Sequence, residues 1–252
     1  MGAQSPGPAK LHSSVGDTPT RLDSDSSCAQ SYGACAMSAR DSVSTAPRLG
    51  AAGYERFVTG VAPFVLATAG FVAVVISHLI DFGSDNLRIG LLDADSDASW
   101  SHHLIAALLV VATALALASA WRSRDHRGLW AVVTGILAFI AVDELSSLHT
   151  QVDQMAWGKA LYAPILLVLG ISLWRLAARR PRGWVLRVGV AVLFVSFGIH
   201  VFGPHIVHAL GYGTDSWPYQ VKVAFKQGTE LAGWLLVLMA LWSLLPSRSP
   251  SR

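Results

Sequence analysis

The sequence contains little charge. Charged residues make up 14% of the 252 residues, whereas a soluble globular domain carries about 25%. Apolar residues make up 52%, the mean hydropathy is +0.46, and the apolar residues form long runs separated by short polar segments. The shortage of charge therefore excludes an ordinary soluble globule and predicts an integral membrane protein.

Cysteine is also scarce, because the chain has only Cys28 and Cys35. Both lie in residues 1–54, where Ser, Ala, Gly, Pro, Asp and Thr dominate and no apolar stretch could form a core. We predict that this segment is a disordered cytoplasmic tail and that its two thiols have no role. The segment has no apolar run of roughly 7–15 residues typical of a secretory signal, and Met37 is a second candidate start of translation.

Six apolar runs follow Arg56, each long enough to cross about 30 Å of hydrocarbon, which takes around 20 helical residues. We therefore predict an all-α bundle of six transmembrane helices in residues 55–246 and a short cytoplasmic tail in residues 247–252. The expected spans are Phe57–Ile80, His103–Trp121, Leu129–His149, Trp157–Trp174, Trp184–Ala209 and Val221–Leu245.

The basic residues predict the orientation of this bundle. The loops on one side hold ten Lys and Arg residues, and the loops on the other side hold four. The positive-inside rule therefore places the first side, together with both termini, in the cytoplasm. The pI near 9.1 follows from these short flanking loops and gives no support to nucleic-acid binding. We expect a multi-pass protein of the plasma membrane.

Four polar residues lie deeper in the predicted bundle than an interfacial position requires. Counted at 1.5 Å per residue from the cytoplasmic ends of their spans, Asp143, His200 and Glu230 lie about 21–24 Å into a core about 30 Å thick. Glu144 adjoins Asp143. Since burying a carboxylate there costs at least about 2.5 kcal/mol, we predict a shared polar site near the extracytoplasmic face. In the alternative interpretation, each side chain only joins two helices through a hydrogen bond.

The stretch from Asp143 to His149 limits how such a site could form. Successive helical residues turn by about 100°, so one straight helix cannot direct Asp143, Glu144 and His149 at the same point. Either the helix bends after Glu144 or the two acids serve different partners. In the last span, Lys226 and Glu230 have the i, i+4 spacing of an ion pair.

The residue types at this site suit a divalent metal. Pro204 in the fifth span predicts a kink that turns the imidazoles of His200, His205 and His208 toward the bundle interior. Imidazoles with carboxylates favour zinc or a similar ion, whose bound water would serve as the nucleophile of an intramembrane hydrolase. The candidate catalytic residues are Asp143, Glu144 and Glu230, and the candidate metal ligands are His149, His200, His205 and His208.

Two resemblances accompany this hypothesis. Ser99-x3-His103, Asp143 and the late histidine group resemble the intramembrane hydrolases that include the alkaline ceramidases and the progestin-type receptors, which have seven spans and a late H-x3-H. Over residues 55–245, the D-E-x4-H motif from Asp143 to His149 resembles an uncharacterised bacterial family of multi-pass membrane proteins. The second resemblance implies a membrane protein without implying an activity.

Two other classes of function remain open. A b-type haem needs axial histidines on facing helices, which His78 or His103 opposite His200 could supply. A proton- or cation-coupled transporter would use the intramembrane carboxylates as relays. In each class the expected partners are the lipid bilayer and a lipid or small molecule that enters from the outer leaflet.

Overall fold

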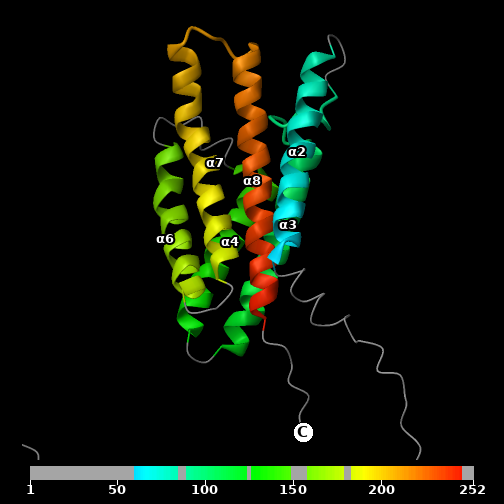
Figure 1. The fold of residues 1–252 in the computed structure, drawn as a ribbon. Coiled ribbons are helices and arrows are strands. Elements are labelled where there is room, and N and C mark those ends of the chain that lie inside the picture. The colour runs from blue at the N-terminus through cyan, green and yellow to red at the C-terminus, as the bar shows by residue number, and fades with distance from the viewer. Residues whose placement is uncertain (1–59, 85–88, 124–125, 149–157, 179–182, 246–252) are drawn as a thin grey trace, which may run out of the picture. The chain divides into compact units, whose positions relative to one another are not determined.

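The computed structural model describes residues 60–84, 89–123, 126–148, 158–178 and 183–245, and helices joined by turns make up this part (Figure 1). These residues contain six α-helices and no strand, so the all-α prediction is confirmed for them. The predicted tails, residues 1–54 and 247–252, lie outside the described part. The helices are α2 (Ala62–Gly83), α3 (Trp100–Arg122), α4 (Arg127–Ser146), α6 (Gly158–Ala178), α7 (Trp184–Ala209) and α8 (Trp217–Leu244).

Local sequence explains several helix ends. Ser99 caps α3, because its side chain accepts a hydrogen bond from the His102 backbone N–H, and this makes α3 start three residues before the predicted span. Ser147 ends α4 in the left-handed conformation with φ 50°, so this helix stops before His149. Proline stands in the first turn of both α2 and α8, where its missing N–H leaves no hydrogen bond unmade.

Five of the helices form a closed ring. Going round it, α3 packs on α4, α4 on α6, α6 on α7, α7 on α8, and α8 on α3, while α2 lies outside the ring against α8. Because consecutive helices run in opposite directions, α2, α4 and α7 end where α3, α6 and α8 begin (Figure 1). We call this end of the bundle the polar end and the opposite end the basic end.

Glycines allow α7 and α8 to pack closely near the middle of the bundle. A Cβ on Gly233 of α8 would lie 2.7 Å from the Leu193 side chain, and one on Gly189 of α7 would lie 3.0 Å from Leu236. Small residues at such positions are typical of helix packing in membranes. The two helices therefore pack tightly in the half of the bundle nearer the basic end.

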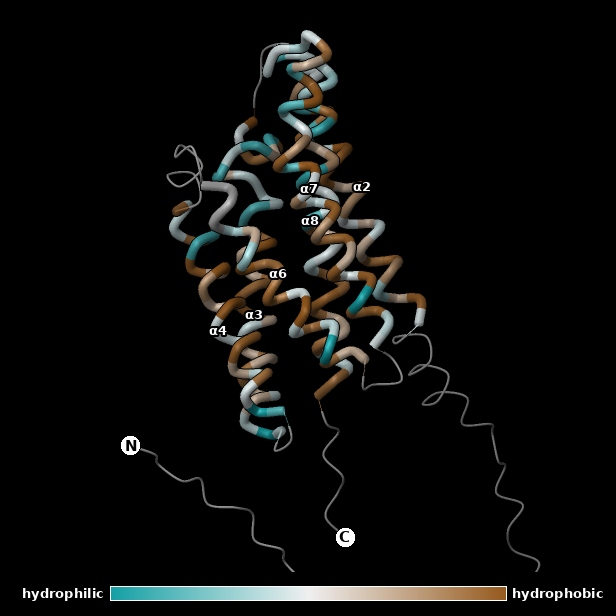
Figure 2. The backbone as a smooth tube through the Cα atoms, turned by 90° about the vertical axis from the view of Figure 1, so that its left-hand side faces the viewer, coloured by the Kyte–Doolittle hydropathy of each residue, from teal (hydrophilic) through white to brown (hydrophobic). Residues whose placement is uncertain are grey.

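The helix surfaces are suited to lipid. Four helices, α2, α3, α4 and α7, are long and apolar enough to cross a membrane. Large apolar side chains such as Leu145, Phe202 and Trp242 are exposed on the outside, and Figure 2 shows apolar residues along the helices with hydrophilic ones toward their ends. Within α6 the apolar stretch is shorter, Tyr162–Ala178, and α8 carries Lys and Glu residues.

Candidate functional site

A cavity of about 280 Å³ lies inside the five-helix ring, toward the polar end. All five ring helices line it, and residues 94–97 of the connection between α2 and α3 complete it. We call it the central cavity. Its charged and polar lining includes Asp95, Asp97, His102, Asp143, Glu144, Tyr162, His200, Lys222, Lys226 and Glu230.

An ion pair between α3 and α4 forms one wall of the central cavity. His102 Nδ1 lies 2.9 Å from Glu144 Oε1, and both side chains are largely buried. Since a carboxylate oxygen can only accept, Nδ1 carries a proton and donates it. Ser99 fixes the first turn of α3 at this place through its cap, so the helix start that positions His102 is set by the local sequence.

Asp143 faces the other neighbour of α4. Its side chain is only 5% exposed, and its Oδ1 accepts a hydrogen bond of 3.0 Å from the Tyr162 hydroxyl on α6. Asp143 and Glu144 therefore bind different partners on different helices. This is one of the two arrangements that the sequence left open, and it follows from the turn of about 100° between successive residues.

The wall formed by α8 carries the second ion pair. Lys226 Nζ lies 2.8 Å from Glu230 Oε2, which confirms the pairing predicted from their i, i+4 spacing. The Ser196 hydroxyl on α7 donates to the Lys226 backbone carbonyl at 2.9 Å, so the two helices are joined beside this pair. One turn nearer the polar end, the ammonium of Lys222 lies 4.2 Å from the centroid of the Tyr219 ring.

The floor of the central cavity is apolar. On each of α4, α6, α7 and α8, the lining residue nearest the basic end is apolar and the residues nearer the polar end include polar ones. These apolar residues are Ile140, Leu166, Leu193 and Trp234. Leu193 lies nine residues from the start of α7 at Trp184, which is about 14 Å along the axis. Since α7 has 26 residues, the cavity extends from the polar end over about two thirds of this helix.

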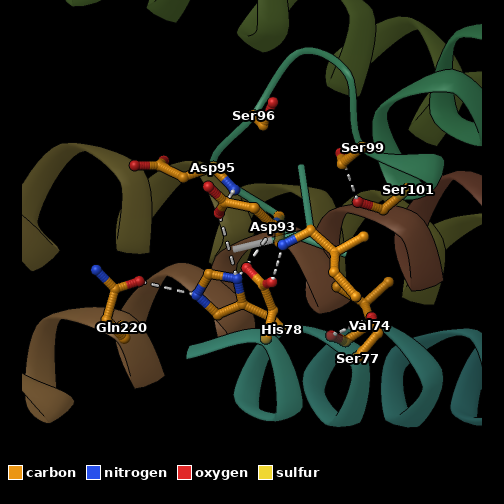
Figure 3. Close-up of polar contacts among 12 residues, drawn as sticks. Val74, Ser77, His78, Asp93, Asp95, Ser96, Ser99, Ser101 and Gln220 are labelled. Atoms are coloured by element: carbon orange, nitrogen blue, oxygen red, sulfur yellow. Dashed lines mark hydrogen bonds and ion pairs between the residues drawn. The ribbon is translucent and has the colours of Figure 1, made fainter. Parts of the chain in front are cut away.

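The connection between α2 and α3 is held in place by His78, as Figure 3 shows. The Ala94 backbone N–H donates to His78 Nδ1 at 3.0 Å, and a backbone N–H can only donate, so Nδ1 is unprotonated. His78 Nε2 then carries the proton and donates to Gln220 Oε1 at 2.9 Å. With 1% of its surface exposed, His78 fixes the segment that brings Asp95 and Asp97 to the central cavity.

A second cavity of about 170 Å³ lies beside this histidine. His78 and Asp81 of α2 line it together with Asp215 and Gln220, and Asp95 lines both cavities. Asp81 Oδ1 accepts a hydrogen bond from the Ile89 backbone N–H at 2.6 Å. The polar residues of this smaller cavity thus serve in part to hold the loop.

The structure brings together some of the predicted site residues and separates others. Asp143, Glu144, His200 and Glu230 all line the central cavity, although their roles remain a prediction. The expected convergence of three imidazoles is wrong, because α7 continues through Pro204 to Ala209 and leaves His205 and His208 exposed and outside the cavity lining. His149 lies outside the described residues.

Two residues with clear positions in the site were not predicted, and a third has a role other than the one considered. His102 and Tyr162 hold the two acids of α4. His78, named above only as a candidate haem ligand, holds the loop. The only sequence signal for His102 was its position three residues after a capping serine, and this signal concerns the helix rather than its neighbours.

The described residues do not gather into a metal-ligand set. Within this part of the chain, no group of three or more His, Cys, Asp or Glu side chains could hold a metal ion. His102 with Glu144 and Lys226 with Glu230 instead form pairs. A haem also fits poorly, since the central cavity is at the lower limit of about 300–1,000 Å³ that is usual for ligand pockets.

Four helices apolar enough to cross a membrane and a cavity lined by ionisable side chains among the helices are typical of an α-helical membrane protein with a polar site. The chain belongs to the family described as a domain of unknown function, DUF8692, whose model matches residues 58–244. Comparison with curated proteins and with solved structures gave no match. The family agrees with the expectation of an uncharacterised group, whereas the D-E-x4-H motif and the likeness to alkaline ceramidases are not confirmed.

Proposed function

We propose that all six helices cross the plasma membrane, with the basic end and both termini in the cytoplasm. Exposed tryptophans support this placement, because aromatic side chains collect at membrane interfaces. Arg122, Arg175 and Arg187 lie in the end turns of α3, α6 and α7 on the same side. The exposed tryptophans of the basic end are Trp121, Trp174, Trp184 and Trp242.

The charges of α8 are consistent with a sixth span. Lys222, Lys226 and Glu230 line the central cavity instead of the outer surface, so the helix need not present them to lipid. Intramembrane ionisable residues face a bundle interior or a water-filled cavity in this way. The composition of α8 therefore reflects its position in the ring.

Cysteine labelling tests this orientation. Cys28 and Cys35 are first replaced by serine, and a single cysteine is introduced as Ser96→Cys at the polar end or as its matched control Ser123→Cys at the basic end. In intact cells, a membrane-impermeant maleimide should label the first variant alone, and the second only after permeabilisation. The opposite pattern would invert the proposed topology, and labelling of both would contradict it.

We propose that the protein is a proton-coupled transporter of a small polar solute. The observation that carries this proposal is the central cavity, in which ionisable groups from five helices meet inside the bundle. Carboxylates and imidazoles at such depth are typical of proton relays in membranes. Transporter sites lie near the bilayer midplane, and the cavity reaches past the middle of α7 and α8 to a floor at Leu193 and Trp234, about a third of each helix from the basic end.

An ion pair between two helices can couple their contact to proton binding, as a proton-coupled transporter requires. His102 on α3 and Glu144 on α4 lie 2.9 Å apart, and proton transfer to Glu144 would remove the charge that strengthens this hydrogen bond, so it would weaken the contact between these helices. The zinc hydrolase expected from the sequence has less support, because the described carboxylates and imidazoles form no set of three metal ligands.

Proteoliposomes test the transport function. The full chain is reconstituted in vesicles that enclose a pH-sensitive dye, and a panel of small amines, carboxylates, zwitterions and sugars is added outside. At least one solute should change the internal pH, and Glu144→Gln should abolish the change while Asp215→Asn, outside the central cavity, should preserve it. If no solute moves protons, or if Glu144→Gln behaves like the parent chain, the proposal is wrong.

A further inference from the structure

We propose that the ligand of the central cavity is a small organic ammonium ion, an inference that rests on the transport function proposed above. Two independent properties of the lining indicate this chemistry. One is an excess of carboxylates over cationic groups, and the other is a set of aromatic rings contributed by three helices. Both are properties that proteins use to bind ammonium groups.

The charge of the lining is negative. Five carboxylates line the central cavity, and the lysines among its described residues are Lys222 and Lys226. The charge of Lys226 is balanced by Glu230 at 2.8 Å. The remaining groups are four carboxylates, the ammonium of Lys222 and the imidazoles of His102 and His200. Even if both imidazoles were protonated, these described residues would together carry one negative charge, which favours a cationic ligand. The other four carboxylates are Asp95, Asp97, Asp143 and Glu144.

The carboxylates that make the lining negative lie at the entrance. Asp95 and Asp97 are exposed, and in the described part of the chain neither carboxylate makes a side-chain hydrogen bond or an ion pair. They lie on the connection that His78 holds through Ala94. Acidic groups at the mouth of a cavity raise the local concentration of cations. The negative excess of the described lining therefore lies at the entrance, where it would draw a cation into the cavity.

Aromatic rings line the cavity below this entrance. Tyr162 of α6, Phe197 of α7 and Trp234 of α8 contribute them. The face of an aromatic ring attracts a cation within about 6 Å, and sets of such rings bind quaternary and substituted ammonium groups. Carboxylates alone would also suit a metal ion, but rings from three helices favour an ammonium group that carries carbon.

The position of Lys222 agrees with a cationic ligand. Its ammonium lies over the Tyr219 ring, and Tyr219 lines the second cavity instead of the central one. The ammonium of Lys222, the lysine closest to the entrance, therefore lies against the Tyr219 ring of the second cavity. The apolar floor with Leu193 and Trp234 would accommodate a short hydrocarbon part, so a primary alkylamine is a suitable probe.

Three probes of similar shape test whether the central cavity prefers a positively charged ligand. Butylammonium, butanol and butyrate share a butyl chain and differ in charge, and each is titrated into the purified full chain while tryptophan fluorescence is recorded. Butylammonium should bind at least about tenfold more tightly than the other two. The signal should disappear in Trp234→Phe, because Trp234 is part of the cavity floor.

Charge-removing variants locate the binding. Asp143→Asn keeps an oxygen that accepts from Tyr162 but removes the charge, and we expect about tenfold weaker butylammonium binding with butanol unaffected. Should this variant fail to fold, Asp97→Asn at the exposed entrance should weaken binding about threefold, more at low salt than at high salt. The matched control is Asp215→Asn, which lies outside the central cavity and should change nothing.

The outcomes separate the two proposals. If butanol or butyrate binds as tightly as butylammonium, the ammonium inference is wrong, while a proton-coupled transporter of another solute remains in place. If none of the three changes the fluorescence, or if Asp215→Asn weakens binding as much as both cavity variants, the inference is also overturned. The proteoliposome assay then decides the transport function by itself.

Discussion

The pair of His102 and Glu144 offers the most direct test of the site geometry. A double-mutant cycle with His102→Ala, Glu144→Ala and the double variant isolates their coupling energy. Interhelical hydrogen bonds in membrane proteins average about 0.6 kcal/mol and reach about 1.7 kcal/mol. This contact is short at 2.9 Å and largely buried, and a charged partner roughly doubles the strength of a hydrogen bond. We therefore expect a coupling of about 1–1.5 kcal/mol.

The measurement is the free energy of unfolding in mixed detergent and SDS micelles, followed by helicity. A control cycle uses His103, the next residue, whose Nδ1 donates to the Ser99 carbonyl at 2.8 Å and does not bind Glu144. The control coupling should stay below about 0.3 kcal/mol, the usual error of additivity. If the cycle with His102 gives a value as small as this control, α3 and α4 do not meet as described and the wall of the cavity is wrong.

Three further perturbations test other parts of the bundle. Tyr162→Phe removes the donor to Asp143, and we expect about 1 kcal/mol lower unfolding free energy in the same micelle assay. Gly233→Ala places a Cβ against Leu193 and should destabilise by about 1–3 kcal/mol, whereas Gly135→Ala, with nothing within 4 Å, should be neutral or stabilising. His78→Leu leaves the Ala94 N–H without its acceptor, so limited proteolysis should cut residues 89–99 faster than in the parent chain.

The parts of the fold that depend on one helix at a time were predictable. Apolar runs and helical rise gave the positions of the helices to within a few residues, and the predicted fifth span matches α7 from Trp184 to Ala209. The same rise placed Asp143, His200 and Glu230 at a common depth, and all three line one cavity. Depth along a helix follows from the residue count alone, because each residue adds about 1.5 Å.

Contacts between helices were not predictable in the same way. The partners of Asp143 and Glu144 depend on which helices flank α4 and on how these helices are rotated. Chain order favours α3 and α6 as neighbours, but the rotation that brings His102 and Tyr162 to the two acids has no signal in the sequence. The inward turn of His205 and His208 was inferred from Pro204 by a local rule. In the structure the helix continues, because bonds lost at a proline in a membrane helix can be replaced by local adjustment.

The ring order also explains the composition of α8, the most polar of the candidate spans. This helix packs on α2, α3 and α7, so α2 covers part of its outer surface while its Lys and Glu residues line the cavity. A helix that is enclosed in this way can carry charges that a lipid-facing helix could not. The polarity of α8 and the apolar faces of α2 and α7 are therefore two consequences of one arrangement, in which the charges of α8 face the cavity inside the ring.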